Sequence, residues 1–152
     1  MDMTEMAPII EETIKNGGEA TLTVVGISMF PLLLSGRDSV VLEKAEHVKK
    51  YDVVFYRRAN GKYVLHRILG EKCGAYMTAG DNQTIIEYPV QRAAVIAKAK
   101  GFYRKGRYIS AQSALQKIYA FLWAKVIPYR VELLKKGDKI RRILHGQHKD
   151  QR

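Results

Sequence analysis

The stretch "YDVVFYRRANGKYVLHRILG" (residues 51–70) carries the clearest folding signal of the chain. Two runs rich in valine, isoleucine, leucine and aromatic residues flank Asn60-Gly61, a dipeptide typical of tight turns between antiparallel strands. The pattern predicts a β-hairpin whose strands are Asp52–Arg58 and Tyr63–Gly70. Because a hairpin needs no helical crossover, it favours an antiparallel sheet.

Short β-type segments continue on both sides of this hairpin, and no helical pattern separates them. Such an order predicts a mainly β, antiparallel domain rather than a parallel α/β sheet. Lys105-Gly106 indicates a further turn after the last segment. The other predicted strands are Ala20–Val25, Ser39–Glu43, Ala75–Ala79 and Ala93–Tyr103.

Helices are expected at both ends of this β-domain. The first is predicted to start at Pro8 and to end at Asn16-Gly17-Gly18. After Ser110 the apolar residues recur every three to four positions, as in an amphipathic helix. We therefore expect a β-domain with its N-terminal helix over residues 1–110, a basic amphipathic helical extension over 111–145 and a disordered tail over 146–152.

Composition excludes several classes of protein. The 152 residues, 47% hydrophobic and 27% charged, indicate one globular domain. Cys73 is the only cysteine and the four histidines lack ligand spacing, so we expect no disulfide framework, no metal site and no cofactor. The acidic N-terminus does not resemble a signal peptide, and no apolar run reaches the roughly 18 residues of a membrane span.

The basic charge is concentrated in the last third of the chain. Residues 98–152 contain 15 Lys or Arg against 3 Asp or Glu, whereas residues 1–97 are nearly balanced. This asymmetry suggests an anionic partner, a membrane surface or nucleic acid, or else a solvated basic tail. Because the N-terminal helix is single and acidic and no helix-turn-helix precedes the β-domain, nucleic acid is the less favoured partner.

The segment "GISMFPLLLSG" (residues 26–36) places a serine between a glycine and a proline after a β-like run. Ser28 is either a turn residue or a nucleophile, and a nucleophile needs a base near it. His66 in the hairpin is the candidate base, although a histidine in a strand can also be a packed core residue. Asp81 in "AGDN" is by itself only a turn signal.

Taken together, these segments resemble the type I signal peptidase family, which includes the self-cleaving SOS-type repressors. The resemblance spans roughly residues 20–107 and implies a β-domain of that type. It implies that Ser28 attacks a peptide carbonyl, and that His66 replaces the lysine base as in the endoplasmic-reticulum and archaeal branch. It further implies that Asp81 supports His66. The segments, in order, are Gly26-x-Ser28-Met29-x-Pro31, "YDVVFY", "YVLHRILG" and "TAGDN".

The same resemblance implies an extended precursor or leader peptide as substrate, with small side chains before the cut. The backbone N–H of Ser28 would stabilise the oxyanion. Met29 fits core packing equally well, and Glu87 stands where the family has a second aspartate. Supporting or cleft roles fall on Gly26, Met29, Pro31, Arg67, Asn82 and Glu87.

The expected membrane anchor before the β-domain is missing, so we expect a cytoplasmic or peripheral membrane protein. The C-terminal helical region could lie in a membrane interface, or pack on the β-domain as an ordinary amphipathic helix. The alternative to an endopeptidase is a non-catalytic module that binds peptide, lipid or nucleic acid on the same fold. The candidate residues for a membrane or anionic surface are Trp123, Lys125, Arg130, Lys135 and Lys136.

Overall fold

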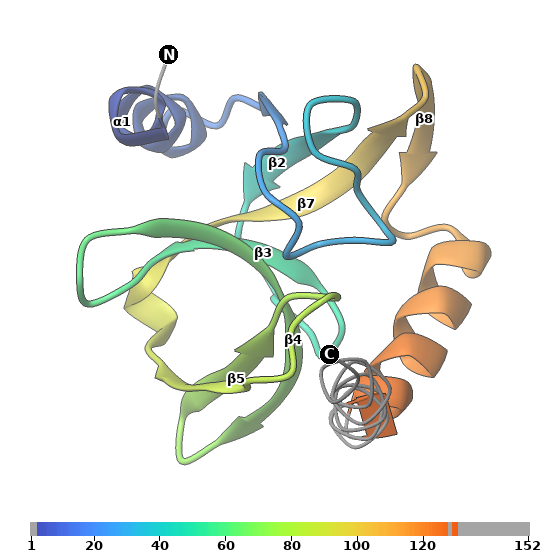
Figure 1. Cartoon of the computed structure of the whole chain (residues 1–152). Coiled ribbons are helices and arrows are strands. Elements are labelled where there is room, and N and C mark those ends of the chain that lie inside the picture. Colours follow the sequence, from blue (N-terminus) through green and yellow to red (C-terminus); the bar gives the residue numbers. More distant parts are fainter. Residues whose placement is uncertain (1–2, 128, 131–152) are drawn as a thin grey trace, which may run out of the picture.

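The computed structural model describes residues 3–127 and 129–130. In this part of the chain, eight antiparallel strands form one sheet. Helix α1 (Met3–Lys15) and a C-terminal helix (residues 114–127, continued at 129–130) lie well apart from each other beside the sheet (Figure 1). The expectation of a mainly β domain with flanking helices is confirmed.

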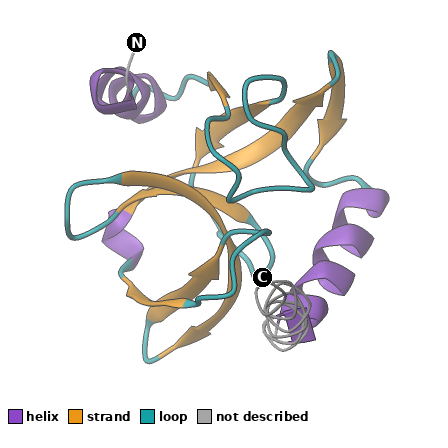
Figure 2. Ribbon diagram, viewed as in Figure 1, coloured by secondary structure: helices purple, strands orange, loops and turns teal. Residues whose placement is uncertain are grey.

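The sheet runs in the order β1-β2-β7-β3-β4-β5-β6, and β8 pairs with β7. Strands β3, β4 and β5 curve strongly, so that this part of the sheet bends round on itself (Figure 2). The bounds are β1 (Ala20–Thr23), β2 (Ser39–Lys44), β3 (Val53–Arg57), β4 (Tyr63–Lys72), β5 (Ala75–Ala79), β6 (Glu87–Val90), β7 (Val95–Arg104) and β8 (Arg107–Ser110).

The predicted hairpin is confirmed, but its turn is one residue longer than the dipeptide signal suggests. The Arg58 N–H donates to the Lys62 carbonyl over 2.8 Å, and the Gly61 N–H donates to the Arg58 carbonyl over 2.9 Å. Gly61 has φ 82°, so the connection is a three-residue loop that ends on a left-handed glycine. The resulting register pairs Tyr56 with Val64 and Val54 with His66.

Other differences from the predicted elements are small. The sequence pattern does not predict strands β6 and β8. Helix α1 begins at Met3, so Pro8 lies inside it and not at its start. Strong apolar patterns are sufficient to predict the longer strands, whereas β6 is four residues long and contains a proline.

Strand β3 explains how the two faces of the curved sheet are both buried. Val53 and Phe55 point into the larger core cluster, which α1 covers. Val54 and Tyr56 point to the opposite face, where they pack in a smaller cluster with Ile68 and other residues. Because successive side chains alternate between faces, a residue's position along a strand decides which of the two clusters it joins.

The C-terminal helix packs on the domain through one side only. Its inward side buries Gln116, Ala120 and Ile127. The apolar residues whose spacing predicts the helix, Leu115 and Leu122 among them, are instead exposed on its outer side. Within the described residues, no helix combines the length and the apolar character needed to cross a bilayer.

Candidate active site

Ser28 lies in a long loop between β1 and β2 that is closed at its base by backbone hydrogen bonds. The Val24 N–H donates to the Asp38 carbonyl over 3.0 Å, and the Gly36 N–H donates to the Val24 carbonyl over 2.8 Å. Gly26 turns the chain with φ 87° and donates its N–H to Ser35 Oγ over 3.0 Å. A side chain at Gly26 would be strained at this φ, which accounts for the glycine two residues before the serine.

The buried Asp38 carboxylate holds the far end of the loop. It accepts hydrogen bonds from the Leu34 N–H at 2.9 Å and the Lys105 N–H at 3.2 Å, and Arg37 forms a fork on both of its oxygens. The hydrogen bonds from Arg37 hold the pKa of Asp38 well below its usual range, although burial opposes them. Arg37 and Asp38, which follow the segment that contains Ser28, thus fix the loop through their ion pair and the hydrogen bonds of Asp38.

The backbone of Ser28 rests directly on the turn after β5. The Asn82 N–H donates to the Ser28 carbonyl over 2.8 Å. A Cβ added to Gly80 would lie 2.5 Å from the Ser28 carbonyl oxygen and 3.1 Å from Ser28 Cβ. Only glycine allows this close approach, so Gly80 is the residue that lets the serine loop reach the sheet.

His66 lies next to Gly80 across the β4–β5 pair. Arg67 pairs with Ala79, so continuing the antiparallel register by one residue places His66 opposite Gly80. Paired positions project to the same face with Cβ atoms about 5 Å apart. Since Ser28 occupies the space where a Gly80 side chain would project, Ser28 and the His66 side chain lie on the same face.

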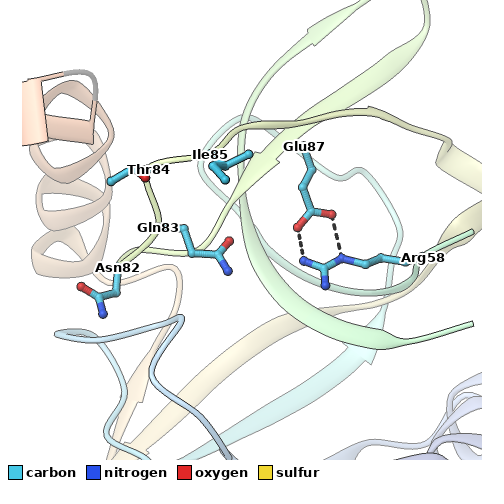
Figure 3. Close-up of a pocket in the computed structure, with 6 residues that line it drawn as sticks. All are labelled: Arg58, Asn82, Gln83, Thr84, Ile85 and Glu87. Carbon is cyan, nitrogen blue, oxygen red and sulfur yellow. Dashed lines mark hydrogen bonds and ion pairs between the residues drawn. The ribbon is translucent and has the colours of Figure 1, made fainter. Parts of the chain in front are cut away.

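Glu87 reaches this face from β6, where it pairs with Thr78. Arg58 binds both of its oxygens, with Nε donating to Oε2 over 2.9 Å (Figure 3). The Tyr56 hydroxyl donates to Oε2 over 2.8 Å. Burial by itself raises the pKa of Glu87, but the hydrogen bonds from Arg58 and Tyr56 lower it below the ordinary value. Glu87 is therefore an anion at neutral pH.

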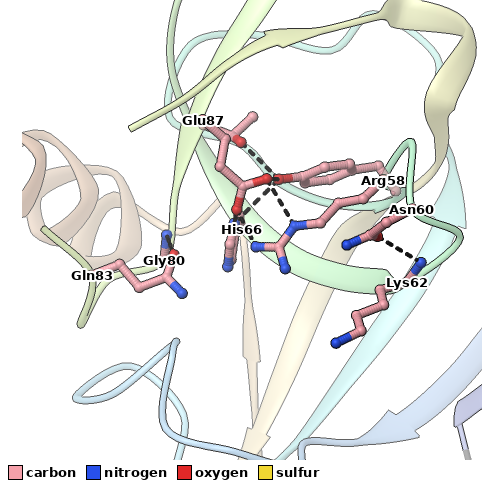
Figure 4. A network of polar contacts seen from close by, with 9 residues as sticks. Arg58, Asn60, Lys62, His66, Gly80, Gln83 and Glu87 are labelled. Atoms are coloured by element: carbon pink, nitrogen blue, oxygen red, sulfur yellow. Dashed lines mark hydrogen bonds and ion pairs between the residues drawn. The ribbon is translucent and has the colours of Figure 1, made fainter. Parts of the chain in front are cut away.

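The contacts of His66 indicate which of its ring nitrogens carries the proton. Nδ1 lies 3.2 Å from Glu87 Oε1 and 3.2 Å from the Tyr56 hydroxyl oxygen (Figure 4). The carboxylate can only accept, and the single hydroxyl proton of Tyr56 is directed to Glu87. Nδ1 must therefore donate, which leaves the lone pair of the neutral ring on Nε2.

The electrostatics keep His66 neutral. Burial lowers the pKa of His66 to about 4, and the neighbouring Glu87 carboxylate only partly opposes this effect. Burial likewise raises the pKa of Tyr56 to about 12, so its hydroxyl stays protonated as a donor. Thr78 Oγ1 lies 2.9 Å from the same hydroxyl. A neutral imidazole with a fixed tautomer is the state that a general base requires.

The contacts of Asp81 differ from the role that the resemblance implies for it. Both carboxylate oxygens bind Arg67, at 2.8 and 2.7 Å, and Oδ2 also accepts from the Tyr119 hydroxyl at 3.0 Å. The acid that lies against His66 is Glu87. The physical reason is alternation along the strands, since Arg67 follows His66 and Asp81 follows Gly80, which places this pair on the other face.

The C-terminal helix holds the backbone of the same turn. Trp123 Nε1 donates to the Asp81 carbonyl over 2.8 Å, and Arg130 donates to that carbonyl over 2.6 Å and to Asn82 Oδ1 over 3.0 Å. The Trp123 ring stacks on Tyr119 and carries Arg130 over its face, 4.6 Å from the ring centroid. Residues predicted for a membrane surface, Trp123 and Arg130, thus face the β-domain.

The remaining predicted residues have surroundings of their own. Met29 is 1% exposed and belongs to the larger core cluster, so it packs in the core. Pro31 accepts a hydrogen bond from Arg104 through its carbonyl. Lys125 is exposed and lies over the Phe121 ring, 4.7 Å from its centroid. Lys135 and Lys136 lie outside the described residues.

An open cavity lies next to Glu87 and Arg58. It measures about 460 Å³ and is lined by the Asn82–Ile85 segment together with Arg58 and Glu87 (Figure 3). A larger hollow of about 1200 Å³ shares Arg58, Ile85 and Glu87 with it and continues along β6. Glu87 thus connects the buried histidine with a surface that an extended chain could follow.

Among the described residues, no cluster of histidine, cysteine and carboxylate side chains could hold a metal ion. Compared with known protein families and with curated proteins, the chain matches none of them.

Sequence reasoning misses most of the groups that hold His66. It does not single out Tyr56, Arg58 or Thr78, and it includes Glu87 only as a weak counterpart of a family acid. The available signal is the register of the hairpin, because Tyr56 and His66 are two residues apart across the β3–β4 pair and on one face. Thr78 and Glu87 require knowledge of β6, whose pattern is too short to predict.

Proposed function

We propose that this protein is a serine endopeptidase in which Ser28 is the nucleophile and His66 is the general base. The observation that carries the proposal is a buried, neutral histidine whose Nδ1 lies 3.2 Å from a Glu87 carboxylate oxygen, on the face of the sheet where Ser28 rests on Gly80. A core histidine with no chemical role does not need a carboxylate on one nitrogen and a serine loop on its own face. The resemblance of the segment order to signal peptidases supports the same conclusion.

The proposed reaction is acyl transfer through Ser28. His66 Nε2 takes the proton from Ser28 Oγ as the oxygen attacks a peptide carbonyl, and Glu87 stabilises the imidazolium that forms. The tetrahedral oxyanion is met by the Ser28 N–H. His66 then gives the proton to the leaving amine, and the C–N bond breaks to leave an acyl-serine ester. Water, deprotonated by the same nitrogen, hydrolyses the ester and restores Ser28.

We expect the contact between nucleophile and base to form when substrate binds. Within the described residues, Ser28 Oγ forms no hydrogen bond to His66. Such contacts are often long in a free enzyme and tighten in the substrate complex. The exposed side chains of Ile27 and Phe30 beside Ser28, and of Ile85 in the cavity wall, offer apolar contacts to an extended precursor or leader peptide.

A fluorophosphonate probe and a peptide library test the proposal together. Purified protein should be labelled on Ser28 and should cleave peptides that carry small residues before the cut. Ser28→Ala should lose both activities, and His66→Gln should lose at least about 100-fold in rate, because general-base catalysis commonly contributes that much.

The matched control is Ser39→Ala in β2, which removes a serine hydroxyl elsewhere in the same domain. It should be labelled and should cleave like the wild type. Labelling that persists in Ser28→Ala would contradict the proposal by showing that another residue is the nucleophile. The absence of any labelling or cleavage by a folded protein would also contradict it and leave a non-catalytic binding module.

A further inference from the structure

We propose that the outer side of the C-terminal helix is a docking surface for an anionic membrane. The inference concerns a different part of the molecule from the Ser28 site and does not depend on peptidase activity. It rests on an exposed apolar stripe, on the absence of acidic residues from the described part of the helix itself, and on the way the opposite side of the helix is fixed.

The stripe is defined by five residues at intervals of three or four, which places them on one side of the helix. Their exposed fractions are well above those of ordinary packed apolar residues in a small domain. They are Leu115 (79%), Ile118 (55%), Leu122 (56%), Val126 (39%) and Tyr129 (69%). We call this set the outer stripe.

The helix cannot bury the outer stripe by rotating on the domain. Its inner side is held by the buried Ala120 and Ile127 and by the hydrogen bonds from Trp123 and Arg130 to the Asp81 turn. Rotation would break these bonds and expose the core contacts. The helix lies at the edge of the molecule in Figure 1, and its outer stripe is exposed.

Charge decides which occupant fits. Residues 88–131 contain nine Lys or Arg and no Asp or Glu. Lys125 lies next to the outer stripe as an exposed cation, and Lys117 is exposed further round the helix. A second copy of the chain would bring like charges together along this helix, whereas anionic headgroups would neutralise them. An apolar stripe on a basic helix that carries no acidic residue is the pattern of helices that lie in the membrane interface.

Vesicle flotation tests the surface directly with the full chain. The parent protein carries Ser28→Ala, so that vesicle binding is measured apart from peptidase activity. It should bind vesicles of phosphatidylcholine with 30 mol% phosphatidylserine, and should bind pure phosphatidylcholine at least tenfold more weakly. The double variant Ile118→Gln and Leu122→Gln retains every charge and the helix propensity. It should bind the anionic vesicles at least tenfold more weakly.

The matched control is Ile9→Gln, which replaces an apolar residue on α1 that is 59% exposed, and it should bind like the parent. Circular dichroism melts of all variants confirm folding. Binding that survives in the double variant would assign it to basic charge alone and overturn the proposal. Equal binding to both vesicle types, no binding, or concentration-dependent self-association that the double variant abolishes would also overturn it.

The only tryptophan of the chain reports the orientation. Trp123 faces the domain, so its emission maximum should stay unchanged when anionic vesicles are added, and brominated lipids should not quench it. Strong quenching would show that the helix leaves the domain and inserts its inner side, which contradicts docking through the outer stripe.

Discussion

Two carboxylates of the molecule, one buried and one partly exposed, have the same kinds of partners and different surroundings. Asp81 and Glu87 are each bound by an arginine through two hydrogen bonds and by a tyrosine hydroxyl. The partners are Arg67 and Tyr119 for Asp81, and Arg58 and Tyr56 for Glu87.

The difference between the two acids lies in what else they can reach. Asp81 is fully buried beside Arg67, which is 3% exposed, and the C-terminal helix closes this side. Glu87 is 22% exposed and also contacts His66. The lesson is that residue type and hydrogen-bond count do not identify the acid that lies against His66. The face of the sheet on which the acid lies does, because only Glu87 shares the face of His66.

The first prediction is that Glu87→Gln abolishes most of the activity. The substituted glutamine would still accept a hydrogen bond but would not stabilise the imidazolium, so kcat should fall on the order of 1,000-fold. The unfolding free energy should fall by only about 1–2 kcal/mol, because Glu87 and Arg58 are both partly exposed. Single-turnover peptide cleavage and urea denaturation measure the two effects.

Asp81→Asn is the matched control for this experiment, since both changes convert a carboxylate to an amide. If Asp81→Asn abolishes cleavage in a fully folded protein while Glu87→Gln remains active, the roles of the two acids are reversed. The triad implied by the family resemblance would then be correct.

The second prediction concerns stability, where Asp81 should have the larger effect. Asp81→Asn leaves the buried Arg67 guanidinium without a counter-charge, and breaking such a pair costs about 3–5 kcal/mol. The bonds from the helix to the Asp81 backbone carbonyl remain, so the folded fraction should retain kcat within about tenfold. Urea denaturation followed by activity per folded molecule checks this, and a loss below about 1 kcal/mol would contradict it.

Much of the fold could be predicted because its longer strands have strong local patterns. The hairpin around Asn60-Gly61 shows both the strength and the limit of such signals. A two-residue turn at this dipeptide would pair Tyr56 with Leu65, whereas the observed three-residue loop pairs Tyr56 with Val64. A shift of one residue moves side chains to the other face, so turn geometry decides which polar groups meet.

The candidate site could be predicted only in part for the same reason. Short motifs identify Ser28 and His66, and the structure brings both to Gly80. The acid beside His66 could not be assigned from the sequence. Asp81 lies near His66 but projects to the opposite face of the sheet, and Glu87 reaches His66 from strand β6, which the sequence pattern does not predict. The side of the C-terminal helix that packs on the domain could not be predicted either, because the most regularly spaced apolar residues of this helix are the exposed ones.

The third prediction uses pH to separate the surroundings of His66 from those of an ordinary histidine. The pKa of His66 is lowered to about 4 from 6.5, so the unfolded chain binds more protons than the folded one between these values. The contribution of His66 to stability is complete above pH 6.5 and is lost as the pH falls towards 4, by up to about 3 kcal/mol. His66→Gln should remove this part of the slope in urea denaturation.

The pH dependence of activity should follow the protonation of His66. The acid limb of kcat/KM should lie near pH 4 and not near 6.5, because the base must be neutral. Glu87 raises the pKa of His66. The acid limb of the residual activity of Glu87→Gln should therefore lie at a still lower pH than that of the wild type. A limb near 6.5 in the wild type would mean that the base is solvated or is another group. An unmoved limb in Glu87→Gln would mean that Glu87 does not act on His66, and the distinction between the two carboxylates would then be only structural.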